Sequence, residues 1–112
     1  MPDRYAIKWA AVAEADVEEI LEYITYRDCV ESALGVYEKL MSRIETLASR
    51  PTRCRVPPEL KKLGLSEYHE MIVSPYSVFF RVRGKRVGIV AVLDRRRDLE
   101  EVLIQRALRA GG

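Results

Sequence analysis

Residues 76–93, YSVFFRVRGKRVGIVAVL, have the pattern of two β-strands joined by a tight turn. One face of the first strand would carry Tyr76, Val78, Phe80 and Val82, and the other Ser77, Phe79, Arg81 and Arg83. The turn falls at residues 83–86, RGKR, where a glycine suits a two-residue hairpin connection. The second strand, residues 87–93, is apolar on both faces, which indicates a strand inside the sheet.

The flanking sequence extends this sheet and adds a helix. HEMIV at residues 69–73, followed by Ser74-Pro75, predicts a strand before the hairpin, so the three strands form a meander. After the hairpin, Asp98 and Glu101 have the spacing of a capping box, and residues 99–107 carry the apolar stripe of a C-terminal helix. Residues 51–66 contain three prolines and predict a connecting segment with at most one helical turn, around residues 59–63.

The N-terminal half predicts one strand and a helical hairpin. Tyr5, Ile7 and Trp9 alternate with other residues, as in a strand with one buried face. Helical stripes follow at residues 13–24 and 33–48, with Asp28 and Glu31 as a capping box before the second helix. The predicted fold is a single α+β domain over residues 1–112, β-α-α-β-β-β-α, with the helical hairpin on one face of an antiparallel sheet.

Charge is distributed unevenly along the chain, although the net charge is only +2. Residues 1–49 carry 5 basic and 10 acidic side chains (net −5), and residues 50–112 carry 14 basic and 7 acidic (net +7). The basic half favours an anionic partner. No apolar run reaches the roughly 18–20 residues of a membrane span, and the N-terminus is unlike a signal peptide. We therefore expect a cytoplasmic domain without membrane contact.

A metal site and a disulfide are both unexpected. The chain has one histidine and two cysteines, Cys29 and Cys54, without the spacing of a metal site, and the two thiols should remain reduced. Arg53 and Arg55 flank Cys54 and would lower its thiol pKa if all three side chains converged, but adjacent residues of an extended chain point apart.

The sequence resembles the RelE/ParE superfamily, the toxin halves of type II toxin–antitoxin operons, including plasmid stabilisation toxins. The resemblance rests on the order of five segments: DVEEILEYI, RIETLASRP, PEL…LG…Y at residues 58–68, IVSPYSVFFRVRGKRVGIVAVL, and RRRD at residues 95–98. It implies a growth-inhibiting toxin with no cofactor, neutralised by a cognate antitoxin encoded in the same operon.

The superfamily divides by target. RelE-like members are ribosome-dependent mRNA interferases, whereas ParE-like members inhibit DNA gyrase. The Tyr-Arg pair of the interferases is Tyr76-Ser77 here, and their C-terminal tyrosine position falls near Glu101 or Val102. The resemblance therefore favours a ParE-like gyrase inhibitor. The alternative is an interferase that acts on the ribosome and uses His69, Arg81, Arg95 and Arg96.

Several residues are candidates for these roles. His69 would be a general base beside Arg81, although a half-exposed histidine at a sheet edge is the favoured interpretation. The candidate target-binding residues are Arg81, Arg83, Arg95, Arg96 and Arg97, whose guanidinium groups bind phosphates or carboxylates. For Arg95–Arg97 the alternative is a solvated run paired with Asp94 and Asp98.

The antitoxin is expected to bind exposed apolar residues of the helices. The candidates are Val17, Leu21, Leu40, Ile104 and Leu108. A disordered antitoxin tail would cover such a surface and place its carboxylates against the basic half. A homodimer is a further possible arrangement of the free chain.

Overall fold

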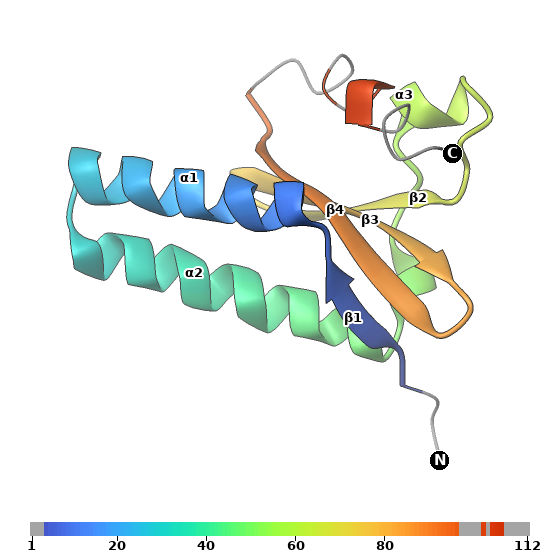
Figure 1. Cartoon of the computed structure of the whole chain (residues 1–112), viewed down its shortest axis with the longest axis horizontal. Coiled ribbons are helices and arrows are strands. Elements are labelled where there is room, and N and C mark those ends of the chain that lie inside the picture. The colour runs from blue at the N-terminus through green and yellow to red at the C-terminus, as the bar shows by residue number, and fades with distance from the viewer. Residues whose placement is uncertain (1–3, 97–101, 103, 107–112) are drawn as a thin grey trace.

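The computed structural model describes residues 4–96, 102 and 104–106 (Figure 1). The elements in chain order are β1 (Ala6–Trp9), α1 (Ala11–Arg27), α2 (Val30–Glu45), α3 (Pro58–Lys61), β2 (Tyr68–Val73), β3 (Tyr76–Arg83) and β4 (Arg86–Asp94). Short 3-10 turns at Thr46–Ala48 and Pro51–Arg53 connect α2 to α3, and residues 102 and 104–106 are helical. The helical turn predicted in the proline-rich segment is confirmed as α3, but the 3-10 turn at Pro51–Arg53 is one more than predicted. The α+β class is confirmed.

The four strands form one mixed sheet in the order β1-β4-β3-β2. The meander β2-β3-β4 is antiparallel as predicted, but β1 pairs with β4 in parallel, with Ala6 opposite Arg86 and Trp9 opposite Ile89. The prediction of a purely antiparallel sheet is therefore wrong. The alternation of a four-residue strand indicates which side chains are buried, but it contains no information about the direction of the partner strand.

Apolar cores lie on both faces of the sheet, as the pattern of residues 87–93 predicts. The hairpin face is covered by α1 and α2, and Phe80 is buried there. The α3 face is covered by Leu60 and Val102, and Phe79 is buried there. A bulge at Val90, between the pairs Phe80–Ile89 and Phe79–Ala91, shifts the alternation of β4 so that Ile89 and Val92 share the hairpin face.

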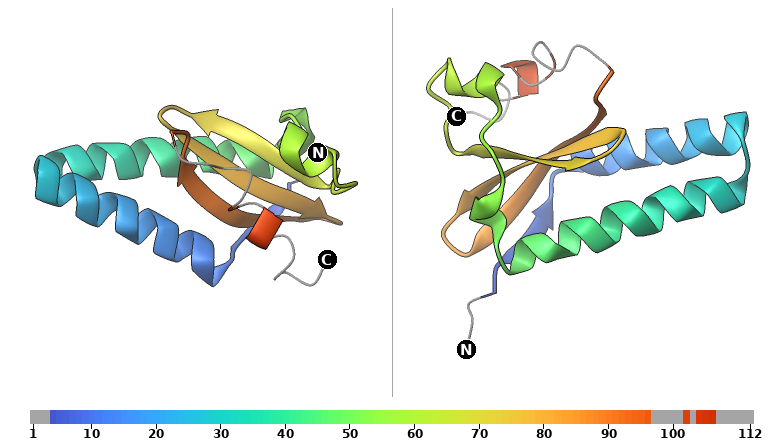
Figure 2. Two further views of the ribbon diagram at one scale, coloured as in Figure 1. Left: turned by 90° about the horizontal axis from the view of Figure 1, so that it is seen from above. Right: turned by 180° about the vertical axis from the view of Figure 1, so that it is seen from behind.

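The helical hairpin projects beyond the sheet. Helices α1 and α2 run antiparallel, and the ends that join them lie away from the strands in every view (Figures 1 and 2). The predicted capping box is wrong, because Asp28 ends α1, its N–H donating to the Ile24 carbonyl at 2.8 Å, and Cys29 is the N-cap of α2. The Asp28 carboxylate instead accepts a hydrogen bond from the Ser32 hydroxyl at 2.7 Å.

The turn between β3 and β4 is set by Gly84. Its φ of +58° lies in the left-handed region, which glycine adopts without steric cost. The C-terminal helix predicted from Asp98 onward falls largely outside the described residues. No helix within the described ranges is long and apolar enough to cross a membrane.

Candidate functional site

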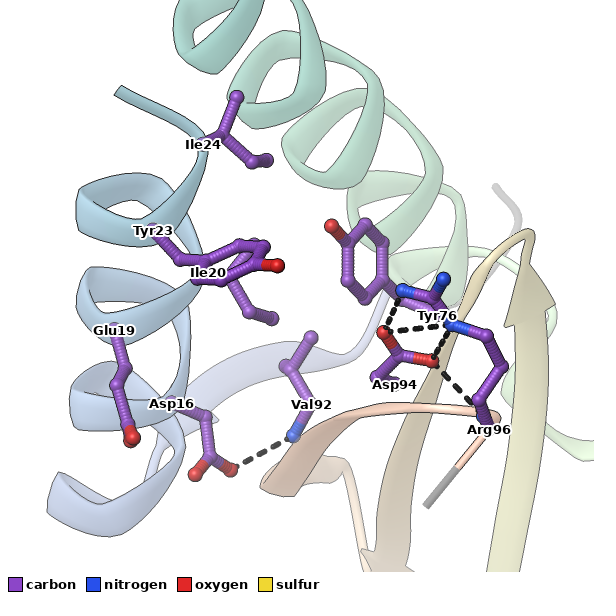
Figure 3. Close-up of a pocket in the computed structure, with 9 residues that line it drawn as sticks. All are labelled: Asp16, Glu19, Ile20, Tyr23, Ile24, Tyr76, Val92, Asp94 and Arg96. Atoms are coloured by element: carbon purple, nitrogen blue, oxygen red, sulfur yellow. Dashed lines mark hydrogen bonds and ion pairs between the residues drawn. The ribbon is translucent and has the colours of Figure 1, made fainter. Parts of the chain in front are cut away.

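A groove of about 370 Å³ lies between α1, the N-terminal end of β3 and the C-terminal end of β4 (Figure 3). We call it the Arg96 groove. Its lining residues are Asp16, Glu19, Ile20, Tyr23, Ile24, Tyr76, Val92, Asp94 and Arg96. Tyr23 comes from the helix wall and Tyr76 from the strand wall, and both rings border the space between the walls (Figure 3). The groove combines apolar side chains with one cation and three carboxylates.

Arg96 is held in a defined position at the mouth of this groove. Its Nε lies 2.9 Å from Oδ1 of Asp94, its Nη2 donates to Oδ2, and its backbone N–H also donates to Oδ1 at 2.9 Å. The hydrogen bond to Asp94 raises the pKa of Arg96, so its charge is permanent. Arg95 is exposed, and its backbone N–H donates to the Pro75 carbonyl at 2.9 Å. The third arginine of the run, Arg97, lies outside the described residues.

Tyr76 cannot act as a base near neutral pH. Burial raises the pKa of its hydroxyl, and the nearby Asp94 carboxylate raises it further. A phenol with an ordinary pKa of about 10 is already protonated at neutrality. The upward shift therefore leaves Tyr76 as a neutral hydrogen-bonding group in the wall of the Arg96 groove.

Arg81 and Arg83 lie at the other end of the sheet from Arg95 and Arg96. Arg81 is opposite Gly88 near the start of β4, seven residues before Arg95. At a rise of roughly 3.3 Å per residue this separation is about 20 Å. Arg81 donates to the Tyr68 hydroxyl at 3.2 Å, and Arg83 pairs with Glu67 at 3.3 Å. The five arginines predicted to bind the target therefore do not form one cluster.

His69 does not lie beside Arg81. It is opposite Phe80 in the register of β2 and β3, so its side chain is on the hairpin face, whereas Arg81 is on the α3 face. The imidazole stacks on the Phe80 ring at 5.5 Å, and its Nδ1 is 2.9 Å from the Cys54 carbonyl oxygen. The geometry matches the favoured interpretation, a half-exposed histidine in the edge strand β2.

A buried carboxylate lies near the middle of the α3 face. Glu70 accepts hydrogen bonds from the Ser77 hydroxyl at 2.7 Å and from Nε of Arg55 at 2.9 Å. Ser77 is fully buried, so its hydroxyl has no access to a substrate. The resemblance assigns Ser77 to the position of an interferase arginine, and a buried serine offers no cation to a phosphate.

Cys54 is not activated by its arginine neighbours. Burial raises the pKa of its thiol, and this effect is larger than the lowering by Arg53 and Arg43. The convergence of Arg53 and Arg55 on the thiol is therefore not what determines its pKa. Among the residues that the structure describes, no group of histidine, cysteine and carboxylate side chains is arranged to hold a metal ion.

A second groove, the hairpin groove, runs between α1 and α2 beside β1 and also measures about 370 Å³. Its lining residues are Trp9, Glu14, Val17, Glu18, Leu21, Tyr37 and Met41. Beyond it, Val30 and Leu34 expose more than half of their surface. With Tyr37 and Met41 they follow the spacing i, i+4, i+7 and i+11, a second apolar stripe on α2.

The predicted antitoxin residues divide between this groove and the core. Leu21 lines the hairpin groove and is half-buried. Leu40 is fully buried, and Val17 is buried with only its edge at the groove, so both are wrong as exposed docking residues. Both residues lie on the apolar stripes that face the sheet. The remaining apolar residues of α2 lie on its second stripe. Ile104 is half-buried, and Leu108 lies outside the described residues.

Comparison with known proteins decides the family. A family model described as the ParE toxin of type II toxin–antitoxin systems, parDE, matches residues 7–99. The chain belongs to the ParE toxin family. The expected superfamily is thereby confirmed. No curated protein matches the chain significantly.

The fold of this ParE toxin is shared with a solved structure titled "Chromosomal ParDE TA system from P. aeruginosa". The TM-score is 0.69 at 20% sequence identity, and the match covers 81% of this chain and 96% of the other. The family match contains both grooves and the whole sheet except Ala6, but it ends before residues 104–106.

The ion pair between Asp16 and Arg106 of this ParE toxin was not predicted from the sequence. Asp16 accepts hydrogen bonds from the Val92 N–H at 2.9 Å and from Nη1 and Nη2 of Arg106 at 2.6 and 2.8 Å. Arg106 also donates to the carbonyl of Val90, the bulged residue of β4, at 3.3 Å. Asp16 lies three residues after Ala13, on the apolar stripe of α1. A carboxylate on an apolar stripe indicates a buried charge, and buried charges are found with partners. The position of Asp16 was therefore the signal in the sequence for an ion pair.

Proposed function

We propose that this ParE toxin inhibits bacterial growth in the cytoplasm by binding DNA gyrase, without catalysis, and that a cognate antitoxin neutralises it. The observation that carries the proposal is the separation of the candidate catalytic residues. His69 and Arg81 are on opposite faces of the sheet, and Arg95 and Arg96 are at its far end. General acid–base catalysis needs these groups within hydrogen-bond reach of one substrate. The ribosome-dependent interferase is therefore the weaker candidate.

The proposed gyrase-binding surface is the Arg96 groove with its neighbour Arg95. Tyr23 is exposed at 57% and can serve as an apolar anchor beside the guanidinium groups. Asp94 holds Arg96 before a partner arrives, so less side-chain entropy is lost on binding. Arginine forks at the rim would pair with carboxylates of the target protein.

The proposed antitoxin-binding surface is the hairpin groove with the exposed stripe of α2. Apolar side chains of an antitoxin segment would contact Leu21, Tyr37 and Met41. Glu14 and Glu18 line the same groove, so the segment bound there should carry basic flanking residues. This differs from the acidic tail expected from the net charge of the C-terminal half. We also propose that the antitoxin is encoded in the same operon.

The test uses inducible expression in bacteria, with growth, cell filamentation and mRNA integrity as readouts. We expect filamentation with an SOS response and intact mRNA. Replacement of Arg95, Arg96 and Arg97 by alanine should abolish growth inhibition with an unchanged circular dichroism spectrum. The control Lys61→Ala/Lys62→Ala removes exposed charges from α3, outside the groove, and should remain toxic.

His69→Ala separates the two target classes. A gyrase-binding toxin needs no proton transfer from this residue, so the variant should inhibit growth as strongly as the parent chain. Cleaved mRNA in the parent together with a loss of toxicity by several orders of magnitude in His69→Ala would establish the interferase and overturn the proposal.

A further inference from the structure

Four basic residues meet at the end of the sheet that contains the β3–β4 turn. We call them the basic corner: Lys8 of β1, Arg81 and Arg83 of β3, and Arg86 of β4. Their alternate neighbours, among them Ile7, Val82 and Val87, pack into the core of the hairpin face. All four side chains therefore belong to the α3 face. This end is the lower right of the molecule in Figure 1.

The register brings these four charges together. Arg83 is directly opposite Arg86, whose other neighbour is Ala6, and Arg81 and Lys8 flank Gly88 in the next row on the same face. Neighbouring strands are roughly 4.8 Å apart, and residues two apart on a strand roughly 6.6 Å. The backbone positions of the four basic residues thus lie within a square of about 10 Å, far from Arg95 and Arg96.

Like charges directly opposite each other destabilise a pair of strands. Glu67 offsets part of this cost, because its carboxylate lies 3.8 Å from Arg81 and 3.3 Å from Arg83. Lys8 and Arg86 are exposed, and within the described ranges neither forms an ion pair. The corner therefore retains excess positive charge that an anionic partner would neutralise.

We propose that the basic corner binds the sugar–phosphate backbone of duplex DNA without reading its base sequence. A protein partner gains most of its affinity from apolar anchors. The large exposed apolar side chains of the described residues lie on the helices, beside α3 or at the other end of β2. They are Val12, Tyr23, Tyr26, Val30, Leu34, Tyr37, Leu63 and Ile72. A surface of charge without anchors fits a phosphate backbone, to which binding is driven by counterion release.

A duplex fits better than a single strand. Single-stranded nucleic acid binds on aromatic side chains that stack against its bases. Tyr68, beside Arg81, is buried to 2% exposure, and the ring of Tyr5 lies 5.0 Å from Nζ of Lys85. Neither ring presents a free stacking platform. In a duplex the bases stack on each other, so cations alone are sufficient for contact.

This inference is independent of the gyrase proposal, since it concerns DNA binding by the purified chain and another end of the sheet. The experiment measures fluorescence anisotropy of a labelled 20-base-pair DNA duplex of mixed sequence over a series of salt concentrations. Single-stranded RNA of equal length and a poly-glutamate peptide are measured in parallel. We expect sequence-independent duplex binding that weakens steeply with salt, and weaker binding of the other two probes.

Lys8→Gln/Arg86→Gln tests the location of the site. The slope of log K against log salt is negative, and each lost phosphate contact decreases its magnitude by about 1. The expected decrease in magnitude for the double variant is therefore about 2. The charge-preserving variant Lys8→Arg/Arg86→Lys should bind as the parent does. Arg27→Gln/Lys39→Gln on the helical hairpin removes the same net charge and should keep the parent slope.

Three results would overturn the inference. An unchanged slope in Lys8→Gln/Arg86→Gln would show that the corner does not contact DNA. An equal decrease in the hairpin control would show that only net charge matters. Tighter binding of the single-stranded RNA or of the acidic peptide than of the duplex would assign the corner to another class of partner.

Discussion

Asp16 connects three parts of the chain through one carboxylate. It is 8% exposed and accepts hydrogen bonds from the backbone of β4 and from the guanidinium of Arg106. The hydrogen bond to Asp16 raises the pKa of Arg106, so the positive charge of this guanidinium is permanent. The site therefore fixes residue 106 against α1 and the bulge of β4, close to the wall of the Arg96 groove.

Asp16→Asn should destabilise the fold by about 2 kcal/mol, because removing one partner leaves a partly buried guanidinium uncompensated. Urea unfolding measures the change. Glu18→Gln is the control, since Glu18 is an exposed carboxylate on the same helix, and its effect should stay within about 0.5 kcal/mol. Arg106→Gln combined with Asp16→Asn should cost less than the sum of the two single changes. Additive costs would show that the pair does not act as a unit.

The rate at which the Cys54 thiol is alkylated should depend on pH. Burial raises the pKa of its thiol above the ordinary value of 9.0, so the thiolate is scarce at pH 8. In a Cys29→Ser background, the rate of alkylation by iodoacetamide should still be rising as the pH passes 9. The measurement is the rate against pH, compared with a short peptide containing one cysteine. A plateau below pH 8.5 would mean that the neighbouring arginines, and not burial, control the thiol.

The elements differ in how far their sequence determines them. The alternation in residues 76–83 correctly placed Phe80 and Phe79 on opposite faces, because a strand has a strict period of two. The helical stripes correctly predict α1 and α2. Val17 and Leu40 lie on these stripes and are buried, although both are expected from the sequence to be exposed. Apolar residues on the main stripe of a helix pack into the core. Apolar residues beyond that stripe form a second, exposed stripe, as Val30 and Leu34 do on α2.

Features that depend on distant pairings were not predictable. The direction of β1 depends on its pairing with β4, about eighty residues away in the chain. The bulge at Val90, which aligns Ile89 and Val92 on one face, leaves no mark in a continuous apolar run. The separation of Arg81 from Arg95 also follows from the register of β3 and β4, and residue type alone does not reveal it.

Gly35 in α2 weakens that helix without a structural role. Its position is exposed, and a Cβ added there would meet no atom within 4 Å. Gly35→Ala should therefore stabilise the chain by about 0.5–1 kcal/mol and raise the melting temperature by a few degrees. Thermal unfolding by circular dichroism measures the shift. Gly84→Ala is the opposite case, because its φ of +58° strains any other residue, and it should lower the melting temperature. A stabilised Gly84→Ala would contradict this reasoning.

At the scale of the whole molecule, the two charged halves of the sequence occupy different sides. The acidic half forms the helical hairpin, with Glu14 and Glu18 at its groove, and the basic half forms most of the sheet. The hairpin groove and the basic corner are on opposite sides of the sheet. Two partners could therefore bind at once, the antitoxin on one side and DNA on the other.

This arrangement predicts that the two bindings can be removed one at a time. Tyr37→Glu places a charge among the apolar and acidic residues of the hairpin groove, so it should weaken antitoxin binding at least tenfold and leave DNA binding unchanged. Lys8→Gln/Arg86→Gln should have the reverse effects, because changes at distant sites without shared partners are independent. Leu63→Glu, an exposed apolar position near α3, is the control and should affect neither.

Isothermal titration with purified antitoxin and anisotropy with the DNA duplex give both affinities for each variant. If Lys8→Gln/Arg86→Gln weakens the antitoxin as well, the antitoxin reaches around the sheet to the basic corner, as an acidic tail would. The antitoxin and DNA would then compete for the corner, and the toxin–antitoxin complex would lose its DNA affinity. Independent effects predict instead that the complex still binds the duplex with the salt slope of the free chain, because the corner stays open when the groove is filled.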